Sequence, residues 1–281
     1  VGAVEFRGRC VADNAVDGLF FGSLDANPVT NVRLSGTKVT GYTRSGVYLH
    51  AGRGVTLVDV RLWGNGKATY LSGIDGLTVL RGEGRGNDWL WSFPGDGGNA
   101  GQGLSVYGCR DVLVDGFVAE GNGRRTDGGF GAAGLFFQDC DRVSVRFCRA
   151  LGNGDRSGMD GQGIILYGCW DSVLDHCFAE GNLNAGLSLF GDEWCRVVQR
   201  CRIADCTAAD NVCDLALAGN VVDSEVVNST FLCERGYKAM DVAAFHPTDV
   251  RRVALWGNTF RSSQAGKIML EAVPGLAGIS G

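Results

Sequence analysis

Four stretches of the sequence share one pattern and decide the fold: GLSVYGC (103–109), GLFFQDC (134–140), GIILYGC (163–169) and GLSLFGD (186–192). The residues after the lead glycine are Leu104, Leu135, Ile164 and Leu187, at spacings of 31, 29 and 23 residues. Looser copies extend the series: GLFFG (18–22), GVYLH (46–50), DLALAGN (214–220) and DVAAFHP (241–247). A repeat of this length is typical of stacked supersecondary units.

Each repeat consists of short strands separated by Gly and Asn turns, and no stretch has the apolar period of a helix. In the first stretch, the two-residue period of a strand directs Leu104 and Val106 inwards and Ser105 and Tyr107 outwards. Strand-only repeats of this length stack into a solenoid. We therefore predict an all-β, right-handed parallel β-helix of about ten coils, with residues 1–281 as one domain. Its N-terminal cap is expected to lie outside this sequence or to be replaced by a neighbour.

Asparagines and cysteines repeat in register and predict interior columns. The asparagines that end the Gly-Asn turns predict a ladder of hydrogen-bonded side-chain amides: Asn65, Asn87, Asn122, Asn153 and Asn182. Two cysteine columns are predicted, one of Cys109, Cys140 and Cys169 with Cys195 as a candidate, the other of Cys148, Cys177 and Cys201 after Phe117. We expect the 11 cysteines to be reduced thiols. Disulfides and a zinc site are the weaker alternatives.

The lead glycines, stacked Asn turns and Cys or aromatic stacks resemble the pectate-lyase-like right-handed parallel β-helix superfamily, over nearly the whole chain. The resemblance implies a carbohydrate-related function, because that superfamily includes polysaccharide lyases, glycoside hydrolases, mannuronan epimerases, phage tailspikes and adhesins. The sequence has neither the polygalacturonase motifs nor the Asp-Pro-His of alginate epimerases. It therefore does not choose among these activities.

Composition excludes some partners. The net charge is −5 and the pI of the sequence is about 5.2. A general nucleic-acid or anionic-membrane binder is usually basic, so we expect neither partner. The sequence has no apolar run long enough for a membrane span. We leave the compartment open, favour an extracellular or secreted location, and leave room for an oligomer.

Three consecutive coils carry long turns after their ladder asparagine, at 88–102, 123–133 and 154–162. Insertions stacked on one edge are how solenoids build a binding surface. The predicted catalytic residues there are Asp127, Asp160, Arg124 and Arg156, and the predicted substrate-binding residues beside them are Lys67, Trp89 and Trp91. Paired acids suit hydrolysis, cations with a base suit elimination on a uronic acid, and indoles suit stacking on sugar rings. The alternative is a solvated rim with incidental charge.

A second constellation lies in later coils. Asp214 and Asp241 both replace a lead glycine, and if they are in register their carboxylates lie about 5 Å apart. We list Asp241 as a catalytic candidate and the nearby His246 as substrate-binding; two turn-capping acids are the alternative. The outward column Tyr107, Gln138, Tyr167, Phe190, Ala218 and Phe245 is predicted to be either a sugar-stacking strip, with Tyr107 and Tyr167 binding substrate, or an oligomer face.

No cofactor or metal is expected. The segment 127–134 (DGGFGAAG) partly resembles a calcium-binding nonapeptide, but Ala132 replaces the binding acid, so calcium is the weaker alternative. Our leading hypothesis is a carbohydrate-active enzyme, a glycoside hydrolase or uronic-acid lyase, with its polysaccharide in a groove beside the long turns. The rival hypothesis is a non-catalytic polysaccharide-binding tailspike or adhesin segment.

Overall fold

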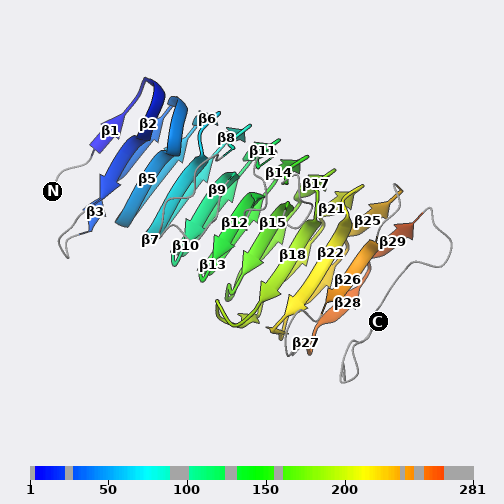
Figure 1. The fold of residues 1–281 in the computed structure, drawn as a ribbon. Coiled ribbons are helices and arrows are strands. Elements are labelled where there is room, and N and C mark those ends of the chain that lie inside the picture. Colours follow the sequence, from blue (N-terminus) through cyan, green and yellow to red (C-terminus); the bar gives the residue numbers. More distant parts are fainter. Residues whose placement is uncertain are drawn as a thin grey trace.

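A computed structural model describes residues 4–22, 28–88, 101–123, 132–154, 161–234, 238–243 and 250–262. These residues contain no helix. Their strands pair only in parallel, and 26 of them form one continuous sheet. The strands lie side by side along a rod, in sequence order from the N-terminal to the C-terminal end (Figure 1). The predicted parallel β-helix is confirmed.

Each coil contributes one strand to each of three faces, which we call the first, second and third sheets. The first sheet holds β2 (Arg9–Gly22), β5 (Lys38–Val58), β7 (Lys67–Leu80), β9 (Gln102–Tyr107), β12 (Ala133–Gln138), β15 (Gln162–Tyr167), β18 (Ala185–Gly191), β22 (Cys213–Gly219) and β26 (Lys238–Ala243). β5 and β7 continue round a corner into the second sheet, and the first residues of β2 and β5 belong to the third.

The second sheet holds β1 (Val4–Phe6), β4 (Val32–Ser35), β10 (Arg110–Asp115), β13 (Asp141–Arg146), β16 (Val173–Asp175), β20 (Arg202–Ala204), β24 (Glu225–Val227) and β28 (Ala254–Trp256). The third holds β6 (Arg61–Trp63), β8 (Glu83–Arg85), β11 (Val118–Glu120), β14 (Arg149–Leu151), β17 (Phe178–Glu180), β21 (Thr207–Ala209), β25 (Thr230–Cys233) and β29 (Thr259–Ser262). Two short additions remain: β3 (Val29–Thr30) pairs with β5, and β19 (Val198–Gln199), β23 (Val221–Val222) and β27 (Val250–Arg251) form a separate small sheet.

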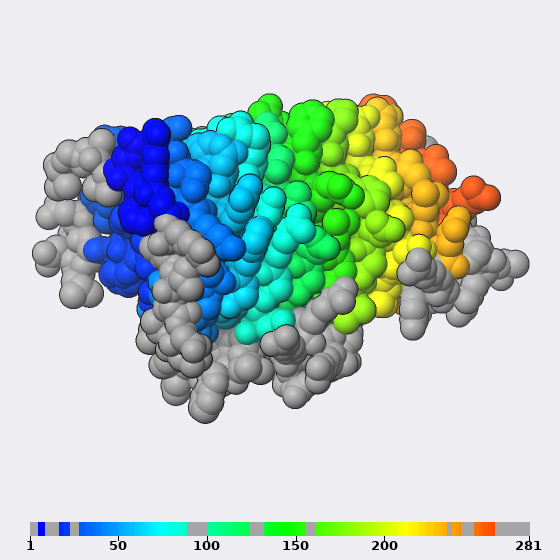
Figure 2. Space-filling view, turned by 90° about the horizontal axis from the view of Figure 1, so that it is seen from above, coloured from blue at the N-terminus to red at the C-terminus, as the bar shows by residue number. Residues whose placement is uncertain are grey.

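The core fills the space between the three sheets. Leu104 pairs with Leu135, and Leu135 pairs with Ile164, so the repeated apolar positions stack in register. These side chains are fully buried in one apolar cluster along the described coils. In the space-filling view the coils follow one another as bands in sequence order (Figure 2). The alternation predicted from the sequence, Leu104 and Val106 inwards, is confirmed.

The asparagine ladder is confirmed and extends one coil further, to Asn211. Asn65 Oδ1 accepts from the backbone N–H of Tyr42. Each later asparagine accepts, through Oδ1, hydrogen bonds from the backbone N–H and the side-chain amide of the asparagine one coil earlier. Asn122, for example, accepts from Asn87 N at 3.1 Å and from Asn87 Nδ2 at 2.8 Å. Its own amide donates to the carbonyl of Gly84 at 2.9 Å. Because every ladder amide is buried, each depends on this pairing.

The ladder explains the lead glycine of each repeat. A Cβ on Gly103 would lie 2.8 Å from Asn122 Nδ2 and 2.6 Å from the carbonyl oxygen of Gly134. Both distances are shorter than real Cβ contacts, so a side chain here would displace the ladder. The lead glycine is therefore set by the space inside the coil.

The cysteine columns are confirmed except at Cys201 and the candidate Cys195. Cys109 N donates to Cys140 Sγ, and Cys169 follows in the same stack. The residue that continues the column after Cys177 is Cys206, because Cys177 N donates to Cys206 Sγ at 3.3 Å. Cys201 belongs to a neighbouring interior column, where Ser224 accepts from its N–H. The prediction for Cys201 was therefore wrong by one column.

The described cysteines are free thiols, and nine of these ten are buried. Cys195 is half-buried and lies outside the interior column, with Sγ accepting from Asp192 N. Burial raises the pKa of the Cys140 thiol far above its usual value, so a thiolate is disfavoured there. Cys10 is the eleventh, and its side chain lies outside the described set.

Candidate functional site

Most of the predicted site residues lie in segments outside the described residues: Arg124, Asp127, Arg156, Asp160, Trp89, Trp91 and His246. Phe245 of the predicted outward column and the 127–134 segment lie mainly or wholly there as well. Their roles stay predictions. The structure does describe Lys67, Tyr107, Tyr167 and Asp241, and these four lie on strands of the first sheet.

The chain on both sides of the three predicted long turns is described, and it stacks at one edge. Gly123 N donates to the carbonyl of Asn87 at 2.9 Å, and Gly154 N donates to that of Asn122 at 2.9 Å. On the returning side, Gln162 N donates to the carbonyl of Ala132 at 3.2 Å. The turns therefore start and end beside the same strands, β9, β12 and β15 of the first sheet.

The outward side of the first sheet, which we call the outer face, has an apolar cluster of its own. Ala133, Phe136 and Ile165 are buried together, separately from the solenoid core. Three half-buried aromatic residues pack against them: Tyr107, Tyr167 and Phe190. Side chains that point out of a solenoid are usually exposed, so burial marks this face as different from the other two.

Seven rings contact one another in series along the outer face, and we call them the aromatic column: Phe20, Tyr48, Tyr70, Tyr107, Phe136, Tyr167 and Phe190. The ring centroids of Tyr48 and Tyr70 are 4.9 Å apart at 9°, and those of Tyr167 and Phe190 are 5.2 Å apart at 12°. Four of the six contacts are face-to-face stacks, so these rings present their edges outwards, whereas Phe136 is tilted by 47° against Tyr107 and by 56° against Tyr167.

Polar groups of the outer face bond to the column. Gln102 Oε1 accepts from the hydroxyl of Tyr107 at 2.9 Å and also from Ser105 Oγ. Lys67 occupies the position of β7 that corresponds to Gln102. It is 2% exposed, with its ammonium 5.5 Å from the Tyr70 ring centroid. A buried ammonium requires acceptors around it, so Lys67 is a structural part of the outer face.

A tyrosine–carboxylate pair ends this polar set. The Tyr167 hydroxyl donates to Asp192 Oδ1 at 2.6 Å, and the same oxygen accepts from Trp194 N at 2.8 Å. Burial, followed by the hydrogen bond to Asp192, raises the pKa of Tyr167 well above its usual value. The phenol is therefore a proton-bearing donor at neutral pH.

The segment 192–197, which follows β18, is a feature that the sequence pattern did not predict. It crosses back over two coils: Arg196 N donates to Asp139 Oδ1 at 3.0 Å, and the Arg196 guanidinium pairs with Asp141 at 2.9 Å. The guanidinium also lies 4.5 Å from the Trp170 ring centroid. The segment presents Trp194 with 76% of its surface exposed. The only feature of the sequence that indicated this segment was a short insertion before Cys195.

The predicted register of Asp214 and Asp241 was wrong. Ala216 pairs with Asp241, and Leu215 pairs with Met240, so the two acids are two residues out of register. Asp241 forms an ion pair with Lys238 at 2.9 Å on the outward side. Ala218 likewise pairs with Ala243, the position that was assigned to Phe245. The proposed close carboxylate pair does not form.

Asp214 instead ends the asparagine ladder. Its Oδ1 accepts from Asn211 N at 3.1 Å and from Asn211 Nδ2 at 2.9 Å, the two bonds that an asparagine one coil later would accept. Desolvation raises the pKa of this fully buried carboxyl from its usual 3.8 to about 6. Its Oδ2 has no hydrogen-bond partner in the part of the chain that the structure describes. Asp214 therefore caps a turn, as the alternative prediction had it, but it does so from a buried position.

Comparison with solved structures finds parallel β-helix proteins. The A-module of the Azotobacter vinelandii mannuronan C-5 epimerase AlgE4 has 12% identity and a TM-score of 0.53, covering 96% of this chain and 80% of that chain. Pectate lyase Pel9A has 16% identity and a TM-score of 0.52, covering 78% and 57%. The Dettilon tailspike protein has 13% identity and a TM-score of 0.52, covering 92% and 56%.

These similarities confirm the resemblance at the level of fold, a right-handed parallel β-helix. The chain spans less than two thirds of the length of the pectate lyase and the tailspike. No family model matches the sequence, and no curated protein matches it. Among the described residues, no helix is long and apolar enough to cross a membrane.

Proposed function

We propose that the chain is a carbohydrate-active protein that binds a polysaccharide along the outer face of β9, β12, β15 and β18. The observation that carries the proposal is the arrangement of this face. The aromatic column supplies ring edges and hydroxyls, Trp194 supplies an exposed indole beside it, and the stems of the three long turns stack at its edge. Apolar surface with a few oriented polar groups suits sugar rings and their hydroxyls.

The proposed reaction is cleavage of the polymer by residues of the long turns. Asp127 and Asp160 would act as the acid and base of a hydrolysis, because two carboxyl groups flank the bond in that reaction. For elimination on a uronic acid, Arg124 and Arg156 would neutralise the substrate carboxylate, and a base would take the C5 proton. Trp89 and Trp91 would bind rings, as would the edges of Tyr107 and Tyr167.

A binding-only function is the second candidate, and one observation favours it. Two described acids on or beside the outer face are already engaged, Asp192 with Tyr167 and Asp241 with Lys238. A tailspike or adhesin segment needs no uncommitted acid. The three relatives at these TM-scores include an epimerase, a lyase and a tailspike by name, so they support carbohydrate chemistry without choosing between the candidates.

The test is incubation with a panel of polygalacturonate, alginate, inulin and dextran. Reducing ends report hydrolysis, and ultraviolet absorbance of the unsaturated product reports elimination. We expect one acidic polymer to be cut, and we expect Arg124→Ala and Arg156→Ala to abolish the cut while Arg33→Ala, an exposed arginine of the second sheet, leaves it unchanged. Retention of wild-type chain by a polymer without products supports the binding-only function. Neither retention nor products on any polymer contradicts both.

A further inference from the structure

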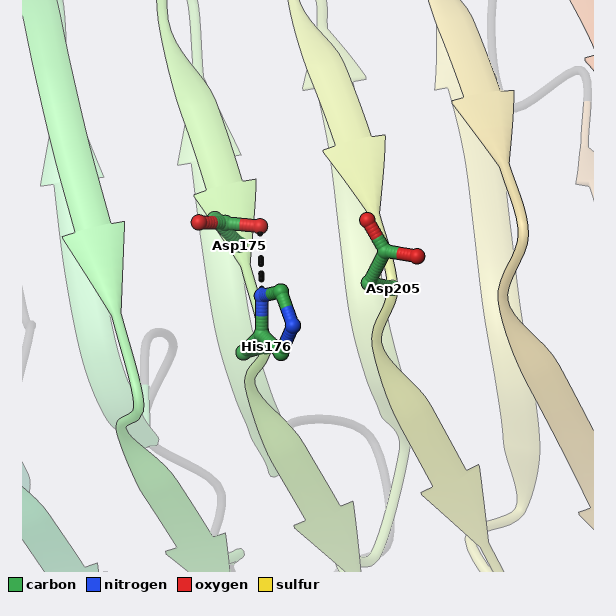
Figure 3. Close-up of side chains that lie close together, drawn as sticks. All are labelled: Asp175, His176 and Asp205. Carbon is green, nitrogen blue, oxygen red and sulfur yellow. Dashed lines mark hydrogen bonds and ion pairs between the residues drawn. The ribbon is translucent and has the colours of Figure 1, made fainter.

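Three potential metal ligands gather at the corner between the second and third sheets. Asp175 is the last residue of β16, His176 follows it, and Asp205 follows β20 on the next coil. One donor atom from each lies within 4.8 Å of the other two. The three side chains come from adjacent coils and lie on the same side of the corner (Figure 3).

The backbone fixes this arrangement. Asp175 pairs with Ala204 across the two coils, and His176 N donates to the Ala204 carbonyl at 3.1 Å. His176 and Asp205 therefore occupy the same corner position one coil apart, both with left-handed φ of 51°. The donor atoms lie within 4.8 Å of one another and must move closer together to share one ion at metal–ligand distances of about 2.1 Å. Rotation of the side chains can bring them closer, because all three are at least partly exposed.

The imidazole is oriented from two sides. Its Nδ1 lies 2.8 Å from Asp175 Oδ1, and its ring packs on Phe147 at 5.1 Å between centroids. Figure 3 shows the second ring nitrogen on the side of the ring that faces the Asp205 strand. At 2.8 Å, Asp175 Oδ1 and His176 Nδ1 are close enough to bind one ion side by side, in place of the hydrogen bond between them.

The charge balance at this corner differs from that of an earlier coil. At the same corner, Asp59 is paired with the guanidinium of Arg81 at 2.9 Å. The neighbour of Asp205 on the following coil is Asn228, which carries no charge. Within the described residues, neither Asp175 nor Asp205 is ion-paired with an arginine or lysine. Arg146, the in-register neighbour of Asp175 on the preceding coil, is paired with Asp115 at 2.9 Å. Two carboxylates therefore remain beside one imidazole, and a bound cation would balance their charge.

We propose that Asp175, His176 and Asp205 bind a divalent transition-metal ion such as Zn²⁺ or Co²⁺. One imidazole nitrogen and two carboxylate oxygens are ligands that these ions accept, and water completes the coordination. The ion links two adjacent coils, so it stabilises the folded chain by mass action. The site is on a different corner from the long turns and is independent of the proposed carbohydrate function.

The probe is Co²⁺, followed by its visible absorbance in fully reduced protein. We expect one ion per chain, with a spectrum lacking the thiolate-to-cobalt charge-transfer band that binding to cysteines would give. His176→Asn and Asp205→Asn should each weaken binding at least tenfold. Asparagine suits the left-handed corner, as Asn228 shows at the same position with φ of 50°. His50→Asn is the matched control, since His50 is another exposed histidine, on β5, with its Nδ1 3.3 Å from Ser72 Oγ.

Melting with and without Zn²⁺ gives a second readout. The wild-type chain and His50→Asn should melt at a higher temperature with the ion, and His176→Asn should lose that increase while melting normally without it. No Co²⁺ binding, equal binding by wild type and His176→Asn, or a thiolate band on the bound ion would each overturn the proposal.

Discussion

The interior and the outer face of the first sheet are built from the same strands but are held in different ways. Inside, each coil repeats the same bonds: Asn87 to Asn122, then Asn122 to Asn153, with the same apolar residues beside them. Outside, the contacts are local and change from coil to coil, as in Gln102 with Tyr107 and Tyr167 with Asp192. The repeat therefore determines the shape, and the departures from it determine what the surface can bind.

The interior contains one such departure. From Asn65 to Asn211 an amide occupies the ladder position, and at Asp214 a carboxylate accepts the same two hydrogen bonds. An amide is neutral, whereas the carboxylate must lose its charge or keep it in the core. The ladder and its end thus provide an internal comparison between neutral and ionisable groups in one geometry.

The largest expected effect comes from breaking the ladder in the middle. Asn122→Ala removes the acceptor of Asn87 N and Nδ2 and the donor to Gly84. Each buried polar group left unsatisfied costs roughly 1–3 kcal/mol, so we expect a loss of about 4 kcal/mol in the free energy of unfolding. Denaturant titration measures it, with Ser144→Ala on the outward side of the second sheet as the control, expected within about 0.5 kcal/mol. Equal stability of both variants would contradict the ladder's role.

The second effect concerns the ladder's end. The pKa of Asp214 is about 6 in the folded chain against 3.8 when unfolded, so the folded state binds its proton more tightly. Its stabilising contribution is present below about pH 4 and is lost as the pH rises through 6. Asp214→Asn keeps the acceptor without the charge, and should raise stability at pH 7 by on the order of 2 kcal/mol.

The pH profile separates this explanation from a simple packing effect. Melting curves of wild type and Asp214→Asn should converge toward pH 4 and diverge between pH 4 and pH 7. A constant difference across that range, or a variant less stable at pH 7, would mean that the carboxylate is not destabilised by burial.

The smallest effect on stability is expected from the exposed indoles. Trp194→Ala should leave the melting temperature unchanged, because most of the side chain is in solvent. It should weaken polysaccharide binding several-fold, since an indole platform is lost. Trp256→Ala is the matched control, because Trp256 is 49% exposed on the second sheet. Affinity electrophoresis in polymer-containing gels compares the two variants. Equal retardation of both would contradict a role of Trp194 in polysaccharide binding.

The interior could be predicted from the sequence because burial repeats with the coil. The lead glycines, the ladder and the first cysteine column all follow from one period. The misplacement of Asp241 has a physical cause: a shift of two residues keeps the inward and outward alternation, so Met240 and Val242 satisfy the pattern equally well. Cys201 was misplaced because the 192–197 segment changes the number of residues in its coil.

The outer face could be predicted only in part. The long turns and Tyr107 and Tyr167 follow from loop length and alternation, and the aromatic column follows in outline. The mutual stacking of its rings depends on side-chain rotation, which no period encodes. The Tyr167–Asp192 bond and the His176 cluster join residues of adjacent coils across turns of unequal length. Their proximity could not be predicted without knowing which residues of the two coils pair in the sheet.

The measurement that tests the central claim most directly is hydroxyl-radical footprinting, with and without the polymer of the panel that retains the chain best. The account predicts reduced oxidation of Trp194 and Phe190 on and beside the outer face, with Phe147 and Trp256 on the other side of the coil unchanged. Protection of Phe147 and Trp256 with none at Trp194 would contradict the claim that the outer face of the first sheet binds the polysaccharide.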